Sequence, residues 1–166
     1  SQGYACNLPD GVRCYQMPLP FVYESNGSEI YFRDCRDKVC RSRRLFAFHK
    51  PETFLELIST EDTLRNKLTT MPELNKEGLR DCQIEAIEGL EESLKNGKPR
   101  DLIQMATGAG KTFTTCNFTY RLLKYAKAKR ILFLVDRNNL GEQTKKEYEQ
   151  FKPKGENKAF TDIYIV

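Results

Sequence analysis

The sequence lacks the features that indicate a membrane or secreted protein. It contains no apolar run of about 18 residues, which is the length a membrane-spanning helix needs. It also lacks a charged-then-apolar leader, so no signal peptide is expected. We therefore expect a cytoplasmic protein without a membrane partner. The first residue is not Met and residues 163–166 are apolar at the other end, so we expect both ends to be cuts inside a longer protein.

The cysteine and histidine residues are not spaced as the ligands of a structural zinc site usually are. The six cysteines include no Cys-x2-Cys pair, and His49 is the single histidine. Structural zinc sites usually use tight ligand pairs, and Cys35 with Cys40 makes half a site at best. Cys82 and Cys116 fall in expected helices, where a small buried thiol is the ordinary explanation. Zinc is not expected, and without a secretion signal neither are disulfides.

Positive charge is small in total but clustered. The net charge of +4 does not by itself indicate a nucleic-acid partner. Residues 33–50 hold seven Lys or Arg against two Asp, and residues 121–130 hold five Lys or Arg and no acid. Such clusters attract phosphate backbones, but each is also typical of a solvated helix face or loop.

The first half of the chain predicts a small β unit followed by short helices. Asn26-Gly27 separates two β-prone runs, residues 21–25 and 28–32, which predicts a hairpin with a type I′ turn. Pro51 suits the first position of a helix. The other elements expected here are a strand over residues 45–48, a helix over 52–59 and a helix over 61–68.

The second half predicts alternating strands and helices. Apolar residues recur at helical spacing from Leu79, and Gly97 follows as a stop signal. A capping box of Asn139 and Glu142 is expected to open a helix ending near Phe151. The remaining elements expected are strands over residues 102–105, 131–135 and 164–166 and a helix over 111–127. This order favours an α/β fold with a parallel sheet.

A glycine-rich loop lies between an expected strand and an expected helix, which is the setting of a phosphate-binding (Walker A) loop. Its residues are Thr107, Gly108, Ala109, Gly110, Lys111 and Thr112. The glycines let the backbone approach phosphate oxygens, and the helix N-terminus attracts the anion. Lys111 is expected on the β- and γ-phosphates and Thr112 on Mg2+, so both are candidate catalytic residues. The strict pattern has Gly where Met105 stands.

Arg80 and Gln83 precede this loop by about one helix. A Gln amide can bond adenine at N6 and N7, and an Arg can stack on a purine. Alone, the pair is typical of a surface helix; before a phosphate loop, it favours adenine recognition.

These residues resemble a known family. Arg80-x-x-Gln83 followed by residues 105–112 is similar to the nucleotide-binding motifs of superfamily 2 helicase-like motors. Residues 132–143 resemble the next motif of the R (motor and nuclease) subunit of type I restriction endonucleases. Residues 8–11, 18–27 and 42–53 resemble the end of that subunit's nuclease domain and its link to the motor.

The resemblance implies an ATP-dependent, DNA-translocating endonuclease that uses ATP and Mg2+. Its implied partners are double-stranded DNA and the specificity and methyltransferase subunits of a restriction complex. It also implies DNA contacts at Arg137 and Asn138. The expected domains are the C-terminal end of a nuclease domain (1–50), a short helical linker (51–76) and the start of a RecA-like parallel-sheet domain (77–166).

Some family features are missing or altered. Cys82 stands where an aromatic residue usually lies beside the adenine-binding Gln. Asp37 directly abuts Lys38, so Asp10 with this pair does not reproduce the nuclease motif, and the nuclease residues are expected upstream. No Asp-Glu box follows the loop, so this chain alone is expected to bind ATP without hydrolysing it. The alternatives are another superfamily 2 DNA or RNA helicase without a nuclease, and a non-catalytic ATP-binding module.

Overall fold

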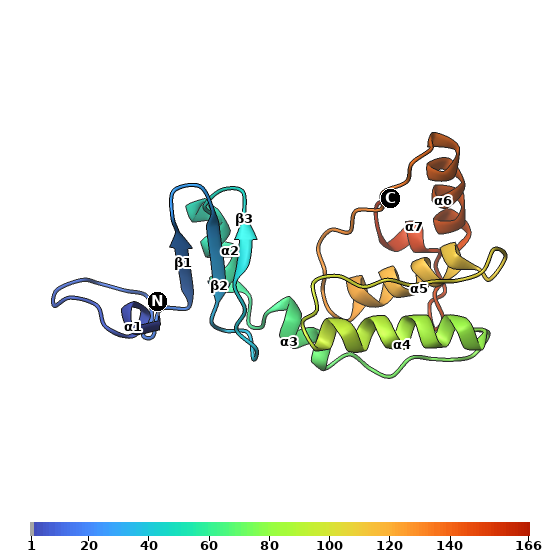
Figure 1. Cartoon of the computed structure of the whole chain (residues 1–166). Coiled ribbons are helices and arrows are strands. Elements are labelled where there is room, and N and C mark those ends of the chain that lie inside the picture. Colours follow the sequence, from blue (N-terminus) through green and yellow to red (C-terminus); the bar gives the residue numbers. More distant parts are fainter. Residues whose placement is uncertain (1) are drawn as a thin grey trace. The chain divides into compact units, whose positions relative to one another are not determined.

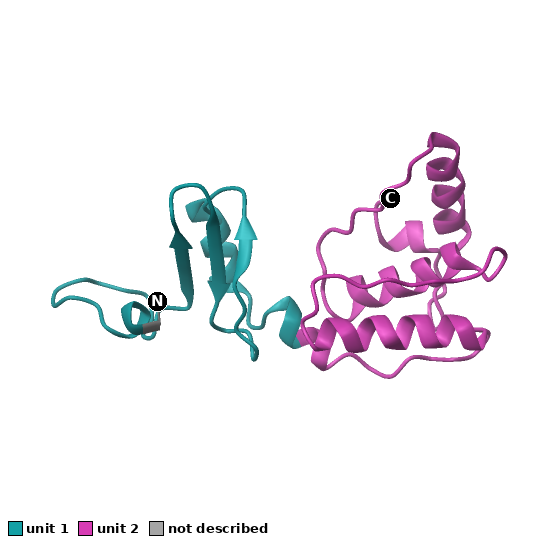
Figure 2. Ribbon diagram, viewed as in Figure 1, with its two compact units in different colours: residues 1–66 teal, residues 67–166 magenta. Residues whose placement is uncertain are grey.

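The computed structural model describes residues 2–166 and shows an α/β chain of two compact units, residues 1–66 and 67–166 (Figure 1, Figure 2). The elements of the first unit are α1 (Gln2–Cys6), β1 (Phe21–Ser25), β2 (Ile30–Asp34), β3 (Arg43–Leu45) and α2 (Pro51–Ser59). The unit boundary falls within α3 (Leu64–Thr69). The second unit contains α4 (Asp81–Lys95), α5 (Lys111–Lys124), α6 (Asn138–Gln150) and α7 (Phe160–Ile163). No helix within residues 2–166 is long and apolar enough to cross a bilayer.

The predicted hairpin is present, but its turn is longer than expected. β1 and β2 pair antiparallel across a four-residue loop, residues 26–29. A type I′ turn needs positive φ at both central residues, and of the two only Gly27 has it, at 92°. Instead, Asn26 Oδ1 accepts the backbone N–H groups of Ser28 at 3.1 Å and Glu29 at 2.8 Å. The predicted turn type is wrong because the Asn26 side chain organises the loop itself.

An aromatic cluster packs the sheet of the first unit against α2. The Tyr23 ring lies 5.1 Å from the Phe32 ring and 6.1 Å from the Phe54 ring of α2. Phe21 lies 5.3 Å from Phe54. The single histidine belongs to this cluster, with His49 Nδ1 2.5 Å from the Tyr23 hydroxyl. Aromatic packing therefore explains why α2 lies against the sheet. It also gives His49 a structural role in the cluster.

The third strand lies earlier than predicted. β3 pairs antiparallel with β2, with Arg43 opposite Phe32 and Leu45 opposite Ile30. Phe46, which was expected inside a strand over residues 45–48, is fully exposed. That strand prediction is wrong in position because apolar side chains suggested it, whereas backbone pairing with β2 sets the real strand. The helices predicted over 52–59 and 61–68 correspond to α2 and α3.

α5 ends three residues before the predicted end. Lys127 takes a left-handed φ of 59°, and the Ala128 N–H donates to the Leu122 carbonyl at 3.0 Å. This arrangement closes the helix C-terminus and satisfies a carbonyl that would otherwise lack a partner. α4 ends, as predicted, before Gly97, whose φ is 68°.

The predicted capping box at the start of α6 does not form. α6 begins at Asn138, and the N-cap position is Arg137, which makes no side-chain capping bond. Asn139 therefore lies inside the first helical turn, where its backbone is helical and its side chain cannot cap. The helix itself is confirmed, ending one residue before Phe151.

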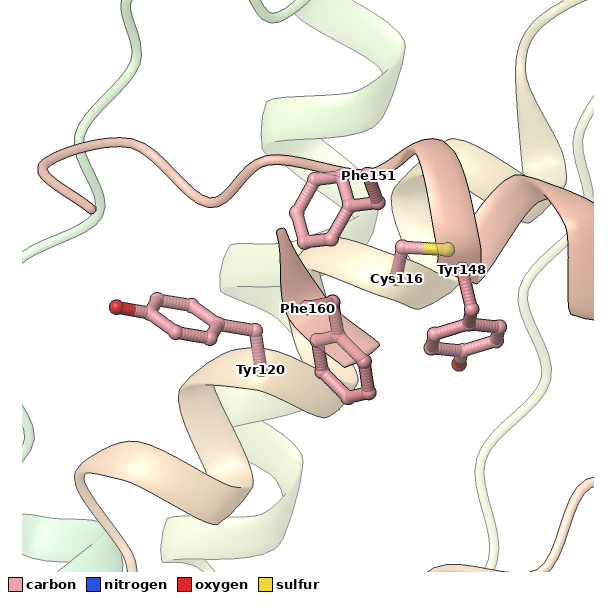
Figure 3. Close-up of a cluster of buried hydrophobic side chains, with 5 residues drawn as sticks. All are labelled: Cys116, Tyr120, Tyr148, Phe151 and Phe160. Carbon is pink, nitrogen blue, oxygen red and sulfur yellow. The ribbon is translucent and has the colours of Figure 1, made fainter. Parts of the chain in front are cut away.

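The second unit has a compact core where α5, α6 and α7 meet, shown in Figure 3. Its buried members are Cys116, Tyr120, Tyr148, Phe151 and Phe160. The Phe160 ring lies 5.1 Å from the Tyr148 ring, and Tyr148 bonds Thr119 through its hydroxyl at 2.9 Å. Aromatic side chains with satisfied hydroxyls thus hold α7 and α6 against α5.

A buried ion pair joins α4 to α5. Arg121 NH2 lies 3.0 Å from Glu91 Oε2, and both side chains are 7% exposed. The same guanidinium donates to the carbonyls of Pro72 at 2.6 Å and Glu73 at 3.3 Å. One side chain therefore fastens two helices and the segment that precedes them.

The parallel sheet predicted for the second half is not formed within residues 2–166. The sheet recorded there is the three-stranded antiparallel one, in the order β1-β2-β3. Residues 102–105, 131–135 and 164–166, which were predicted as strands, are not strands. Leu102 is 92% exposed, and Leu132 is 81% exposed. A central parallel strand needs hydrogen-bonding neighbours and covered faces, and these segments have neither here.

Candidate functional site

The phosphate loop, defined as residues 107–112, leads directly into α5. Gly108 and Gly110 have φ values of 78° and 83°, in the left-handed region that glycine adopts without strain. Gly110 is the N-cap of α5 and supplies no side-chain capping bond. The first turn of α5 therefore presents backbone N–H groups and the positive end of the helix dipole to the loop.

The two residues predicted upstream contact this loop. Arg80 NH1 donates to the Gly108 carbonyl at 3.1 Å. Gln83 Nε2 donates to the Ala109 carbonyl at 3.0 Å. Both side chains come from the start of α4, so this helix end and the phosphate loop form one site.

Gln83 is held at both ends of its amide. Its Oε1 accepts the Arg80 N–H at 3.0 Å, and the side chain is buried. A Cβ at Gly110 would lie 2.5 Å from Gln83 Nε2 and 3.9 Å from Phe113 Cβ. A side chain at position 110 would therefore displace the Gln83 amide and would also adopt a strained positive φ.

Lys111 folds back over the loop. Its Nζ donates to the Ala106 carbonyl at 3.0 Å and to the Met105 carbonyl at 3.2 Å. The side chain remains exposed. The ammonium group is thus positioned by the backbone just before the loop, where Met105 replaces the glycine of the strict pattern without preventing the turn.

The donor set of the loop suits an anion. It combines two left-handed glycines, helix N–H groups and the Lys111 ammonium, with the half-buried Thr112 hydroxyl in the first turn of α5. No group of three or more His, Cys, Asp or Glu within residues 2–166 is arranged to hold a metal ion by itself.

Arg137 and Asn138 lie more than 20 residues after the phosphate loop and do not take part in its contacts with Arg80 and Gln83. Arg137 is 76% exposed at the side chain, and its Nε lies 4.0 Å from Asp136 Oδ2. Asn138 is the exposed first residue of α6. Within residues 2–166 no hydrogen bond or ion pair joins either residue to the phosphate loop.

Acidic partners neutralise much of the clustered positive charge. In residues 33–50, the ion pairs are Arg33 with Glu24, Arg36 with Asp34, Arg43 with Asp37, and Arg44 with Glu29. In residues 121–130, Arg121 is buried against Glu91, and Lys124 Nζ lies 2.7 Å from Glu156. Much of the two clusters is therefore structural, and neither is simply a solvated face.

The two helical cysteines differ in environment. Cys116 is buried as predicted, and burial raises the pKa of its thiol to about 12. Cys82 is exposed on α4, so the prediction of a buried thiol there is wrong. The α4 stripe that begins at Gln83 and continues at Ile87 and Glu91 faces inward, and Cys82 lies outside it.

Sequence reasoning missed the contact of Arg80 and Gln83 with the loop backbone. The sequence did carry a signal for the bond between Gln83 and Arg80, because Gln at the third position of a helix is typical of a residue that bonds back to the N-cap N–H. Gln83 Oε1 makes this bond to Arg80. The acceptors at Gly108 and Ala109 are backbone carbonyls, which no side-chain pattern reveals.

Known proteins resemble both halves of the chain. The family described as Type III restriction enzyme, res subunit, matches residues 76–164. The chain is 36% identical over 159 residues to the type I restriction enzyme EcoKI endonuclease subunit of Escherichia coli (strain K12), covering 89% of this chain and 13% of that protein. It is 33% identical over 156 residues to the EcoAI endonuclease subunit of Escherichia coli, covering 84% of this chain and 18% of that protein.

A third relative matches a shorter stretch of the chain. The type I restriction enzyme SauCOLORF180P endonuclease subunit of Staphylococcus aureus (strain COL) is 30% identical over 88 residues, covering 53% of this chain and 10% of that protein. The chain thus spans less than a fifth of the length of these relatives. No solved structure matches it. The match over residues 76–164 contains α4, the phosphate loop, α5 and α6, and the chain therefore belongs to the res-subunit family of restriction enzymes, with type I endonuclease subunits as relatives over most of its length.

Proposed function

We propose that this chain is the ATP-binding part of an ATP-dependent, DNA-translocating endonuclease subunit of a type I restriction-modification system. The observation that carries the proposal is the joining of Arg80 and Gln83 to the carbonyls of Gly108 and Ala109. The contact supports the proposal because it places the pair proposed to recognise adenine beside the loop proposed to bind phosphate. The family match supports a restriction enzyme.

ATP would be held first by its phosphates. The N–H groups at the start of α5 would bond the phosphate oxygens. Lys111 would exchange its bonds to Ala106 and Met105 for the β- and γ-phosphates, which offer stronger charge-assisted bonds. Thr112 would bind Mg2+, and the cation would neutralise phosphate charge.

Adenine recognition would use the hydrogen-bonding groups of Gln83 that its present bonds leave over, and the buried amide would have to become accessible to the base. A glutamine amide has two N–H donors and an oxygen with two lone pairs. One donor is used on Ala109 and one lone pair on the Arg80 N–H. The second N–H donor would bond adenine N7. The second lone pair would accept a hydrogen bond from the N6 amino group of adenine. Arg80, which is exposed, could stack on the base.

In the longer protein, residues 102–105 and 131–135 would become strands of a RecA-like parallel sheet. Their exposed apolar side chains are what a central strand of such a sheet buries. Arg137 and Asn138 would then stand at the carboxyl end of a strand, where α/β sheets bind ligands, and would contact the DNA backbone. Residues 1–50 would end a nuclease domain and 51–76 would link it to the motor.

The remaining parts of the proposed system lie with other segments and subunits. Specificity and methyltransferase subunits would select the double-stranded DNA, in a cytoplasmic complex. Hydrolysis needs groups that position water and stabilise the transition state, and the phosphate loop supplies only phosphate and Mg2+ contacts. The 166-residue chain should therefore bind ATP without steady turnover.

Titration of the purified chain with a fluorescent ATP analogue and Mg2+ tests the proposal. Saturable binding that unlabelled ATP displaces is expected, and Lys111→Ala should weaken it by about tenfold or more. Lys145→Ala, an exposed change on α6, is the matched control and should bind like the wild type. Equal binding by the two variants would refute the site. Steady release of phosphate by the wild-type chain would instead favour a complete enzymatic module.

A further inference from the structure

The loop that joins β2 to β3 brings two thiols together. Cys35 directly follows β2, and Cys40 lies three residues before β3 (Figure 1). The Cys40 Sγ is 3.6 Å from the Cys35 Sγ, and both residues are exposed. We propose that Cys35 and Cys40 are a reversible oxidation site, a dithiol that low-molecular-weight disulfides convert to an intramolecular disulfide across this loop.

Hydrogen bonds hold the loop in the shape that pairs the thiols. The Cys35 N–H donates to the Pro20 carbonyl at 2.8 Å. Between the two cysteines, the Lys38 N–H donates to Asn66 Oδ1 at 3.0 Å. Hydrogen bonds thus hold the loop at its first residue, Cys35, and again at Lys38 in its middle. The sulfur atoms, now 3.6 Å apart, would approach to the ~2 Å of a disulfide.

An ion pair between a buried carboxylate and a partly exposed arginine further orders the segment between the thiols. Asp37 lies between Cys35 and Cys40, and its Oδ2 accepts a bond from Arg43 NH2 at 2.7 Å. The Asp37 side chain is only 2% exposed. This contact bonds the middle of the loop to the first residue of β3. It therefore restricts the loop to a conformation in which the two thiols are close.

The reaction is two successive thiol-disulfide exchanges. The Cys35 thiolate attacks one sulfur of a small disulfide, forms a mixed disulfide and releases one small thiolate. Cys40 then loses its proton and attacks the Cys35 sulfur, which forms the Cys35–Cys40 bond and releases the second small thiolate. The protein loses two protons and two electrons, and the small disulfide gains both and becomes two thiols.

The two thiols are not equivalent. Partial desolvation and the bond to Cys35 raise the pKa of Cys40 to about 11. Cys40 therefore stays protonated at neutral pH and donates its S–H to Cys35. Because the S–H of Cys40 is directed at Cys35 Sγ, we assign the first attack to Cys35 and the resolving step to Cys40.

The disulfide would close residues 35–40 into a small ring between two paired strands. Closing a loop removes conformations from the unfolded chain and so stabilises the folded unit. In a reducing compartment the pair stays as thiols, and it responds only when the ratio of small disulfide to thiol rises.

Equilibration of the 166-residue chain in oxidised and reduced glutathione buffers tests the proposal. After acid quenching and alkylation, peptide mass mapping should find a Cys35–Cys40 disulfide, two hydrogen atoms lighter than the dithiol, that dithiothreitol reverses. Cys35→Ser and Cys40→Ser should each leave a glutathione adduct on the remaining thiol. Cys14→Ser, which removes another exposed cysteine of the same unit, should form the disulfide normally.

Two results would overturn the proposal. One is alkylation of Cys35 and Cys40 to the same extent as Cys14 after oxidation. The other is glutathione adducts on all exposed cysteines with no internal bond. Circular dichroism of each serine variant establishes that it is folded, so that loss of the disulfide reports chemistry. In the folded wild type, oxidation should also raise the melting temperature by about 4–8 °C or less, an increase absent in both serine variants of the pair.

Discussion

Gln83 Nε2 lies 3.0 Å from the carbonyl oxygen of Ala109, so the start of α4 is bonded to the middle of the phosphate loop. The two residues are 26 positions apart in sequence. Any movement of the loop on nucleotide binding must therefore stretch or carry this amide. The bond makes residue 83 part of the loop's support as well as a candidate for base recognition.

Replacement of this amide should weaken nucleotide binding. Gln83→Ala removes the bonds to Ala109 and to the Arg80 N–H, each worth ~1 kcal/mol, and ATP affinity should fall by about tenfold. Hydrogen exchange of the amides in residues 107–112 should become faster, because the loop loses a tether. Calorimetric titration with ATP and exchange mass spectrometry measure the two effects. Gln150→Ala, at the exposed end of α6, is the control, and equal behaviour of the two variants would contradict the prediction.

A methyl group at Gly110 should disturb the same contact. Gly110→Ala places a Cβ 2.5 Å from Gln83 Nε2 and forces alanine into a φ of 83°. The left-handed conformation alone costs about 1–2 kcal/mol. Urea unfolding should show a loss of this size or more. Gly89→Ala, inside α4 with open space at its Cβ, should instead gain ~0.5–1 kcal/mol, so a stable Gly110→Ala protein would argue against the described loop.

Loss of the buried carboxylate on α4 should be severe. Glu91→Ala leaves the buried Arg121 guanidinium with the carbonyls of Pro72 and Glu73 and the face of the Tyr125 ring but no carboxylate, and should cost about 3–5 kcal/mol of unfolding free energy. Glu88→Ala removes an exposed pair with Lys76 and should cost ~0–1 kcal/mol. Urea unfolding of the two variants compares the costs directly. Similar costs would mean that the Arg121 pair does not hold α4 to α5.

The second unit should weaken in alkaline solution. Burial raises the pKa of Tyr120 from its ordinary 10.0 to about 12. A pKa that is higher in the folded state gives stability that is fully present below pH 10 and is lost as the pH rises through about 12. Thermal melts from pH 9 to 12, with tyrosinate absorbance followed in parallel, should show this loss.

Tyr120→Phe provides the comparison for the alkaline effect. The variant lacks the bonds to Glu156 at 2.8 Å and Lys124 at 2.7 Å, so it should be less stable at neutral pH. Its stability should then decline less steeply between pH 10 and 12, because one buried phenol no longer ionises. Tyr15→Phe, at a site 73% exposed, should follow the wild type. Parallel pH curves for Tyr120→Phe and the wild type would contradict the assignment.

Local rules predicted much of the helical structure. Pro51 begins α2, Gly97 follows α4, and the phosphate loop leads into α5, all as expected from backbone preferences of single residues. The hairpin was also predicted, since β-prone runs around Asn26 and Gly27 act over a short stretch of chain. The turn type and the β3 position were not, because side-chain bonding by Asn26 and pairing with β2 decided them.

The sequence by itself determined the family of the chain, and it predicted residues 107–112 as a phosphate-binding loop. Gly108, Gly110, Lys111 and Thr112 are adjacent, so their chemistry is visible in the order of residues alone. Only the tertiary structure decided that Gln83 bonds Ala109, that Arg121 is buried on Glu91 and that residues 131–135 lie unpaired. Each of these depends on distant segments meeting or failing to meet, because hydrogen bonds, desolvation and sheet pairing act between neighbours in space.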